Sequence, residues 1–372
     1  MLCMILVSCT GQKTGKENDN NDKIAIEVGE IKFPPQDVLQ LKSYYLSSSV
    51  HVDSIDYLIG YNYRLHSLDC MNLKSKSVTQ IVLPGDGPDA IVRLSGIYAQ
   101  SLDSVWISDE SERAFLIDSV GTIKRMIDLK KYLEDQEQLL INTNYAMFTS
   151  HLFYNASRHS LMFLVKHTPS NTFIVKEAFI DEVGKMATYQ LSSSKVVADM
   201  SKGYAYINFP NVNFVGENIV YNYPVESSIY MLDIRTNERK YILADSHYTS
   251  NIIEKCTTSG DYATLEKHWL ENSHFYDIMY LPKYKIYARL HADKVDFDEK
   301  KGMEKLINER DLYLMLFDEN MEKIGETKLS NCRYSPFTSW NATYGGIALF
   351  VDNVLDEKNN TDDLTIDIIS LK

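Results

Sequence analysis

One phrase recurs along the chain and limits the folds that are open to it. "RAFLIDSVGTIKRMIDL" (Arg113–Leu129) is an apolar run that ends at Asp118, a short polar turn and a second apolar run. Five further copies align on the aspartate, some of them looser, at Asp69, Asp181, Asp233, Asp318 and Asp367. The successive separations of 49, 63, 52, 85 and 49 residues average about 60. Repetition on this scale indicates a propeller or a solenoid rather than a sandwich.

Each copy predicts a hairpin whose turn contains the aspartate, because an Asp carboxylate accepts bonds from backbone N–H groups two residues on. Another pair of strands precedes each hairpin. "VRLSGIYAQSLDSVWISDES" has its turn at Ser101–Asp103, and "NVNFVGENIVYNYPV" has its turn at Gly216–Asn218. Strands such as "SLMFLVKH" are almost continuously apolar, which is typical of sheets covered on both faces. Four antiparallel strands form one blade, so six copies predict an all-β, six-bladed β-propeller.

The two ends of the sequence are expected to share the last blade. The sixth copy stops after its third strand, at Lys372, which leaves that blade one strand short. The segment Ile24–Phe33, "IAIEVGEIKF", reads as a strand without a partner. We expect this N-terminal strand to join the last blade as its outer strand and to close the ring, because closure removes two exposed sheet edges.

Three segments with helical spacing explain the long separations. They are "LKKYLEDQEQLLIN" at residues 129–142, "DYATLEKHWLEN" at residues 261–272 and "DEKKGMEKLINERD" at residues 298–311. Insertions of this kind lie on one rim of a propeller. Either they decorate the surface or they form part of a binding rim.

The N-terminus resembles a bacterial lipoprotein signal. Met1–Val7, "MLCMILV", is too short to span a bilayer, but it suits the apolar part of a signal peptide. Leu6 to Cys9 resembles the lipobox, in which the cysteine is lipidated, although no Lys or Arg precedes the run. The alternative is a buried N-terminal strand with an incidental cysteine. We expect a signal peptide over residues 1–8, lipidated Cys9 with a polar tether over residues 9–23, and a single β-propeller domain over residues 24–372.

Charge and cysteine content exclude some classes of function. The formal net charge of −13, with no basic cluster, argues against a nucleic-acid partner. Cys70, Cys256 and Cys332 are an odd number of thiols at wide spacing without a C-x-x-C pair. This pattern does not indicate a zinc site, and small apolar strand residues explain the three thiols.

The whole pattern resembles a known group of proteins. A lipobox followed by six Asp-containing blades, with "PGDGPDAIVRLSG" leading into the second, is similar to the six-bladed propeller lipoproteins of Gram-negative anaerobes. Several of these are grouped only as domains of unknown function. The resemblance implies a propeller attached to the cell envelope by lipid alone, at the outer membrane, on either its periplasmic or its surface face.

Motifs for catalysis and for cofactors are missing from the sequence. It contains no G-x-S-x-G, no H-E-x-x-H and no Gly-rich phosphate loop. The segment Asp296–Gly302, "DFDEKKG", has acids spaced as in a calcium loop but lacks the later glutamate. A solvated charge run explains this segment better, and we predict neither a metal nor a cofactor.

Aromatic and polar residues remain as candidates for ligand binding at the axial mouth, where the inner strands of a propeller converge. Trp340 lies in "SPFTSWNATYGG", whose loop composition is suited to stacking on sugars or peptides. The alternative is that Trp340 packs in the core between two blades. The apolar context of Trp106, "SVWIS", favours a position in the core. The candidates are Arg93, Trp106, His151, Asn213, Tyr223, Tyr276 and Trp340.

Three functions are compatible with these residues. The first is a non-catalytic binding module that contacts a glycan, a peptide or an envelope protein through its axial face, and the lack of a catalytic motif favours it. The second is a lyase or hydrolase that uses acids and tyrosines around the mouth, as a propeller enzyme can without a linear motif. The third is a structural subunit of an envelope assembly.

Overall fold

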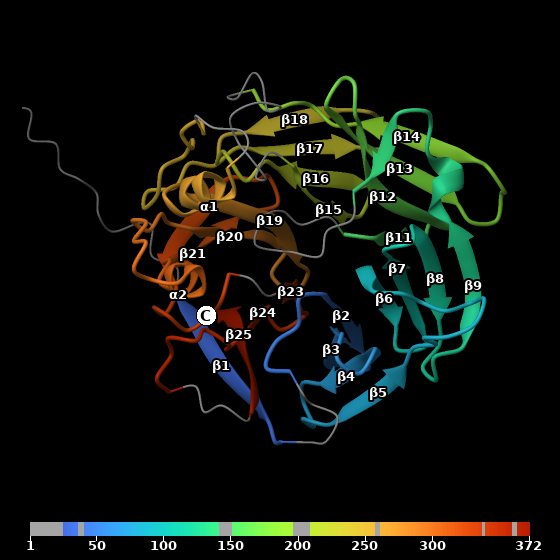
Figure 1. The fold of residues 1–372 in the computed structure, drawn as a ribbon, viewed down its shortest axis with the longest axis horizontal. Coiled ribbons are helices and arrows are strands. Elements are labelled where there is room, and N and C mark those ends of the chain that lie inside the picture. The colour runs from blue at the N-terminus through green and yellow to red at the C-terminus, as the bar shows by residue number, and fades with distance from the viewer. Residues whose placement is uncertain are drawn as a thin grey trace, which may run out of the picture.

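Six sheets are arranged radially around one axis (Figure 1). The structure is a computed structural model that describes residues 25–35, 41–140, 151–195, 209–256, 261–336, 339–358 and 363–372. The predicted six-bladed β-propeller is confirmed. The expected signal peptide, Cys9 and the tether lie outside the described residues.

The first three blades follow one another along the chain, each with antiparallel neighbours. Blade one contains β2 (Ser47–Val52), β3 (Ile55–Asn62), β4 (Ser67–Asn72) and β5 (Val78–Val82). Blade two contains β6 (Leu94–Ser101), β7 (Ser104–Asp109), β8 (Arg113–Ile117) and β9 (Ile123–Asp128). Blade three contains β10 (Glu137–Leu139), β11 (Phe153–Asn155), β12 (Ser160–His167), β13 (Thr172–Phe179) and β14 (Met186–Gln190). Its inner position is shared by β10 and β11, which pair with successive parts of β12.

The next three blades complete the ring. Blade four contains β15 (Asn211–Val215), β16 (Asn218–Asn222), β17 (Ile229–Asp233) and β18 (Arg239–Ile242). Blade five contains β19 (His274–Leu281), β20 (Ile286–Ala292), β21 (Leu312–Phe317) and β22 (Lys323–Lys328). Blade six contains β23 (Trp340–Ala342), β24 (Ile347–Phe350), β25 (Leu364–Leu371) and, as its outer strand, β1 (Ile26–Phe33).

The N-terminal strand closes the ring as predicted. β1 pairs antiparallel with β25 over its full length, from Ile26 opposite Leu371 to Phe33 opposite Leu364. The two strands lie side by side in Figure 1. Arg333 adds a polar connection, because its guanidinium donates to Glu30 of β1 at 2.9 Å and contacts Asp367 of β25. Both ends of the folded domain therefore stabilise one sheet.

The repeated aspartate does not have one role in all six blades. Asp118, Asp233 and Asp318 occupy turns, and each carboxylate accepts the backbone N–H two residues on, at 2.8–3.1 Å. Asp181 also lies in a turn, but its carboxylate pairs with Arg125 at 3.1 Å. The turn prediction is correct for these four copies.

The prediction is wrong for Asp69 and Asp367, which lie inside the third strands of blades one and six and are fully buried. A buried carboxylate needs hydrogen-bond donors, and a tyrosine supplies one in each case. Tyr44 donates to Asp69 at 2.7 Å, and Tyr334 donates to Asp367 at 2.8 Å. Each tyrosine lies in the segment that enters its own blade, so the aspartate fixes the start of the blade to its third strand.

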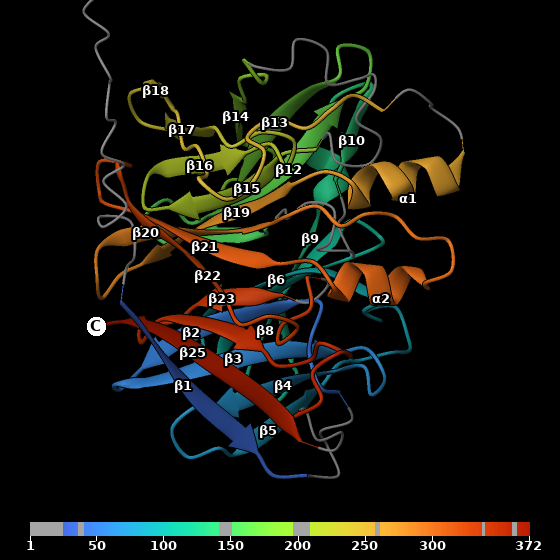
Figure 2. The same cartoon turned by 90° about the vertical axis from the view of Figure 1, so that its left-hand side faces the viewer.

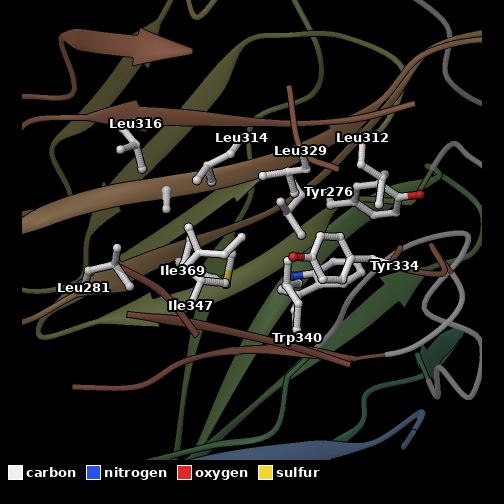
Figure 3. Packing of buried hydrophobic residues seen from close by; sticks show 14 of the residues in the cluster. Tyr276, Leu281, Leu312, Leu314, Leu316, Leu329, Tyr334, Trp340, Ile347 and Ile369 are labelled. Carbon is white, nitrogen blue, oxygen red and sulfur yellow. The ribbon is translucent and has the colours of Figure 1, made fainter. Parts of the chain in front are cut away.

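The core consists of apolar layers between neighbouring blades. Figure 3 shows one such layer, where Leu314 and Leu316 of blade five face Ile347 and Ile369 of blade six. Trp340 and Tyr276 lie at the edge of this cluster. Because each blade is covered on both faces, its middle strands are largely buried, and β21 is buried along its whole length. The continuously apolar strands of the sequence are explained in this way.

Two of the three expected helices are present, α1 (Tyr262–Leu270) and α2 (Met303–Asn308). The helix expected over residues 129–142 is wrong. Within residues 129–140, which the structure describes, Leu129–Tyr132 form the 3-10 helix η1, and strand β10 follows it. Gln136 has a φ of 68° between the two, which a continuing right-handed helix excludes. Pairing of β10 with β12 overrides the helical spacing.

The two faces of the ring differ. α1 leads into the first strand of blade five and α2 connects its second and third strands, so both lie where the first strands begin, and Figure 2 shows them on one side. We call this the helix face. The C-terminus lies on the opposite side in Figure 2, and Ile26 pairs with Leu371 there. We call this the termini face.

Candidate ligand-binding site at the propeller axis

A cavity of about 390 Å³ lies on the axis of the ring. The first strands of all six blades, or the residues next to them, contribute to its lining. Gly216 and Pro282, which belong to exposed turns after β15 and β19, are part of it. The cavity therefore reaches the termini face.

The inner strands of adjacent blades run in the same direction, which fixes the position of each side chain along the propeller axis. Asn211 Nδ2 donates to the Phe275 carbonyl at 2.8 Å, and Asn213 Nδ2 donates to the Ile278 carbonyl at 2.9 Å. These contacts advance in the same direction along β15 and β19. Side-chain amides thus join the inner edges of adjacent blades, and the cavity wall is held by hydrogen bonds between blades.

One side of the cavity is aromatic. Tyr98 of blade two meets Phe153 of blade three edge to face at 5.0 Å between ring centroids. Phe153 stacks on Phe214 of blade four at 4.9 Å with an interplanar angle of 17°. Burial raises the pKa of Tyr98, so its hydroxyl keeps its proton at neutral pH. This side offers ring surfaces and one phenolic group.

The other side of the cavity is polar and centres on Asp277 of β19. Its side chain is only 2% exposed, while that of His151 is 23% exposed. Trp340 Nε1 donates to Asp277 Oδ1 at 2.7 Å, and His151 Nε2 lies 3.0 Å from Asp277 Oδ2. A carboxylate can only accept, so Nε2 of the histidine carries the proton. Asp277 thus connects blades three, five and six at the axis.

Hydroxyl and amide groups continue the polar side into blade one. Asn341 Nδ2 donates to Ser47 Oγ at 2.6 Å, and Ser47 Oγ also contacts Ser339 Oγ. Ser49 Oγ donates to the Ala342 carbonyl at 2.5 Å. The cavity therefore has aromatic rings on one side and neutral donors and acceptors, with a single carboxylate, on the other.

The structure brings together three of the seven candidate residues. His151, Asn213 and Trp340 line the axial cavity. Trp340 is 7% exposed and packs on Tyr276 with 4.7 Å between ring centroids, so it belongs both to the cavity wall and to the core.

The other four candidates lie outside the axial cavity. Trp106 is buried and stacks on Tyr154, as the apolar "SVWIS" context favours. Tyr223 and Tyr276 are each 1% exposed, because β-strand packing between blades covers their rings. Arg93 lies at the start of blade two, in a separate cleft on the helix face. None of these four residues lines the axial cavity, and a part for them in ligand binding stays a prediction.

Sequence reasoning missed Asp277 and the aromatic wall. Asp277 lies in "HFYDIMYL", and a single acid inside an apolar strand is a signal, because buried acids are rare unless paired. Phe153 and Phe214 gave no such signal, since apolar residues in strands usually form the core. No group of three or more His, Cys, Asp or Glu that could hold a metal occurs in the described parts of the chain.

Fold and cavity together define a six-bladed β-propeller with an amphipathic axial site. The family model described as "Domain of unknown function (DUF4221)" matches residues 17–328. The chain therefore belongs to the DUF4221 family, which agrees with the resemblance to propellers of unknown function.

The solved structures that are similar to the chain include two from Bacteroides. A member of the DUF4221 family from Bacteroides vulgatus has a TM-score of 0.75 at 14% sequence identity, over 95% of this chain and 99% of that chain. A Bacteroides fragilis protein described as "Putative exported protein" has a TM-score of 0.54 at 14% identity, over 93% of this chain and 95% of that chain. At such identity both show the fold alone. No curated protein matches the chain.

Among the helices in the described ranges, none is long and apolar enough to cross a membrane.

Proposed function

We propose that the chain is a lipoprotein of the cell envelope, lipidated at Cys9, whose axial cavity binds a glycan without transforming it. The two-sided lining of the cavity is the observation that carries this proposal. A sugar ring has one apolar face of C–H groups and a rim of hydroxyls, so it matches a site with aromatic rings on one side and neutral donors and acceptors on the other.

The size and charge of the cavity support the same ligand class. A volume of about 390 Å³ is at the lower end for small-molecule sites and suits one or two sugar rings. Among the lining residues, the carboxylate of Asp277 already accepts from Trp340 and His151. Ser48, Ser49 and Asn341 are partly exposed and present neutral polar groups.

Lipidation and export rest on the sequence of the N-terminus. The Leu6 to Cys9 segment carries the proposal, and the description of the Bacteroides fragilis relative as a "Putative exported protein" agrees with it. Mass spectrometry of the N-terminal peptide from a membrane fraction tests it. We expect diacylglycerol on Cys9 and release of the Cys9→Ser variant into the soluble fraction. An unmodified Cys9 would refute the anchor.

A glycan array with the full chain carrying Cys9→Ser tests the binding function. We expect a neutral mono- or oligosaccharide among the hits, with at least tenfold weaker binding in calorimetry for Phe153→Ala and for Asn341→Ala. Tyr63→Ala, in the cleft on the helix face, is the matched control and should bind normally. Thermal melting of each variant separates lost binding from lost folding. The proposal fails if no glycan binds, or if both cavity variants bind as the unmodified chain does.

One observation favours a second candidate, a lyase or hydrolase. A histidine held by a carboxylate is the usual arrangement of a general base, and His151 is partly exposed to the cavity. Incubation of the bound glycan, followed by mass spectrometry, distinguishes the two functions. Cleavage that His151→Gln abolishes would establish the enzyme, and an unchanged glycan supports the binding module.

A further inference from the structure

A second cleft, of about 440 Å³, lies between blades one and two. It is lined by Tyr45, Leu46, Tyr61, Tyr63, Arg93 and Leu94 and is called the tyrosine cleft below. Tyr45 precedes β2, Tyr63 follows β3, and Arg93 precedes β6. These strand ends are on the helix face, and none of the six residues lines the axial cavity.

Three tyrosines contribute to the lining of the tyrosine cleft. Tyr45 and Tyr63 are 45% and 49% exposed, and their ring centroids are 6.3 Å apart at an angle of 37°. Tyr61 is buried, with its hydroxyl 3.1 Å from His66 Nδ1. The side chains of Tyr45 and Tyr63 therefore both keep about half of their surface exposed to solvent, although their rings are in contact.

Arg93 gives the tyrosine cleft its charge. Its side chain is 60% exposed, and its guanidinium lies 3.6 Å from Glu110, an exposed carboxylate. At that distance the pair makes no good hydrogen bond, so the donors of Arg93 can bind a better acceptor. The neighbouring Val92, 43% exposed, extends the apolar rim.

We propose that the tyrosine cleft docks a segment of a partner protein that inserts an Asp or Glu side chain next to an apolar one. Tyrosine and arginine are the residues enriched at the centres of protein interfaces. A carboxylate is the natural partner of a guanidinium because it accepts two parallel N–H bonds. Burial is the main cause that raises the pKa of Tyr45, and the nearby Tyr63, Asp352 and Glu304 add to it. Because these two acids lie close to the cleft, the site suits one carboxylate and disfavours a polyanion.

The tyrosine cleft and the axial cavity open on different faces of the ring. The cavity reaches the termini face at Gly216 and Pro282, and the strand ends that form the cleft are on the helix face. The two sites would then serve different ligands on opposite faces. The docking site does not depend on glycan binding at the axis.

A library of random twelve-residue peptides displayed on phage, selected on the full chain carrying Cys9→Ser, tests the proposal. We expect enriched sequences to pair an Asp or Glu with a neighbouring aliphatic or aromatic residue. Calorimetry with the most enriched peptide should show at least tenfold weaker binding when its acid is replaced by the amide, and the same loss for Arg93→Gln. Glu110→Gln should strengthen binding, because it removes the competing carboxylate.

Controls separate this site from the axial cavity. Arg125→Gln removes an exposed arginine elsewhere, and Asn341→Ala alters the axial cavity, so neither should change peptide binding. The proposal is overturned if nothing is enriched, if the enriched peptides lack a carboxylate, or if Arg93→Gln binds them normally. It is also overturned if Asn341→Ala abolishes peptide binding, since the peptide would then occupy the axis.

Discussion

Trp340 Nε1 donates to Asp277 Oδ1 at 2.7 Å and so joins the inner strands of blades six and five. His151 of blade three reaches the second oxygen of the same carboxylate at 3.0 Å, although it lies 126 residues away in the sequence. One buried acid therefore holds three blades in register around the axial cavity. Both the shape of the cavity and the stability of the ring depend on it.

Replacement of Asp277 by Ala should destabilise the protein by about 2–4 kcal/mol, because Trp340 and His151 each lose an acceptor in a largely buried site. Asp277→Asn keeps an oxygen for the tryptophan and should cost less. Denaturant unfolding measures both changes. Asp181→Ala, which removes an exposed carboxylate, is the control and should lie within about 0.5 kcal/mol of the unmodified chain. Equal stability of the Ala variant and the control would contradict the proposed role.

Ring closure can be tested by truncation. A chain that starts at residue 35 lacks β1, exposes the edge of β25 and loses the fully buried Phe33. Loss of this phenylalanine alone should cost about 3–5 kcal/mol. A chain that starts at residue 25 keeps β1 and should melt as the full chain does. If both truncated chains melt at the same temperature, β1 does not stabilise the ring.

Gly60 should not tolerate a side chain. This glycine is part of β3 and lies opposite Asp69 of β4. A Cβ atom at Gly60 would come within 2.5 Å of the Tyr44 ring. Gly60→Ala must displace Tyr44 and weaken its hydrogen bond to Asp69, at a cost of about 1–3 kcal/mol. Gly29→Ala on β1 is the matched control, because the nearest atom to its Cβ would be 3.9 Å away. Thermal or denaturant unfolding of the two variants should therefore differ, and a similar stability would be evidence against this packing.

Stability should fall in acid through Glu326. Burial by itself would raise the pKa of this carboxyl, but His291, Ser246 and the His247 backbone N–H lower it to about 2. The unfolded chain, with an ordinary pKa of 4.5, then binds a proton that the folded chain does not. The contribution of Glu326 is present above pH 4.5 and is lost as the pH falls towards 2.

Burial lowers the pKa of His291 below 6.5, which adds a loss of stability in the same direction below that pH. The free energy of unfolding, measured by denaturant titration between pH 7 and pH 3, checks this expectation. Glu326→Gln should be less stable at pH 7 and should show a shallower decline below pH 4.5. An unchanged slope in this variant would show that other groups cause the acid sensitivity.

Much of the fold could be predicted from particular stretches of sequence. The phase of the apolar runs around Asp118, Asp233 and Asp318 fixed the hairpins, because the turn chemistry of aspartate is local. The strand expected over Ile24–Phe33, which had no partner in the sequence pattern, predicted closure of the ring. The same pattern failed at Asp69 and Asp367, since sequence alone does not tell an aspartate in a turn from one buried beside a tyrosine.

The residues of the candidate site were much harder to predict from the sequence. His151, Asn213 and Trp340 could be named, but Asp277, Phe153 and Phe214 could not be distinguished from core residues of other strands. Arg93 was predicted for the same mouth, and the structure places it in a different cleft. The residues of such a site are irregularly spaced in the sequence, so they form no motif that a sequence pattern can reveal.

The sequence by itself determined the local order of this protein: which runs form strands, how many blades repeat and which strand is left to close them. These features follow from the alternation of apolar runs and turns within about 60 residues. Only the tertiary structure decided which polar groups meet at the axis and which at the rim. Six inner strands, distant along the chain, must first be brought around one centre before a carboxylate of one blade can bind an indole and an imidazole of two others.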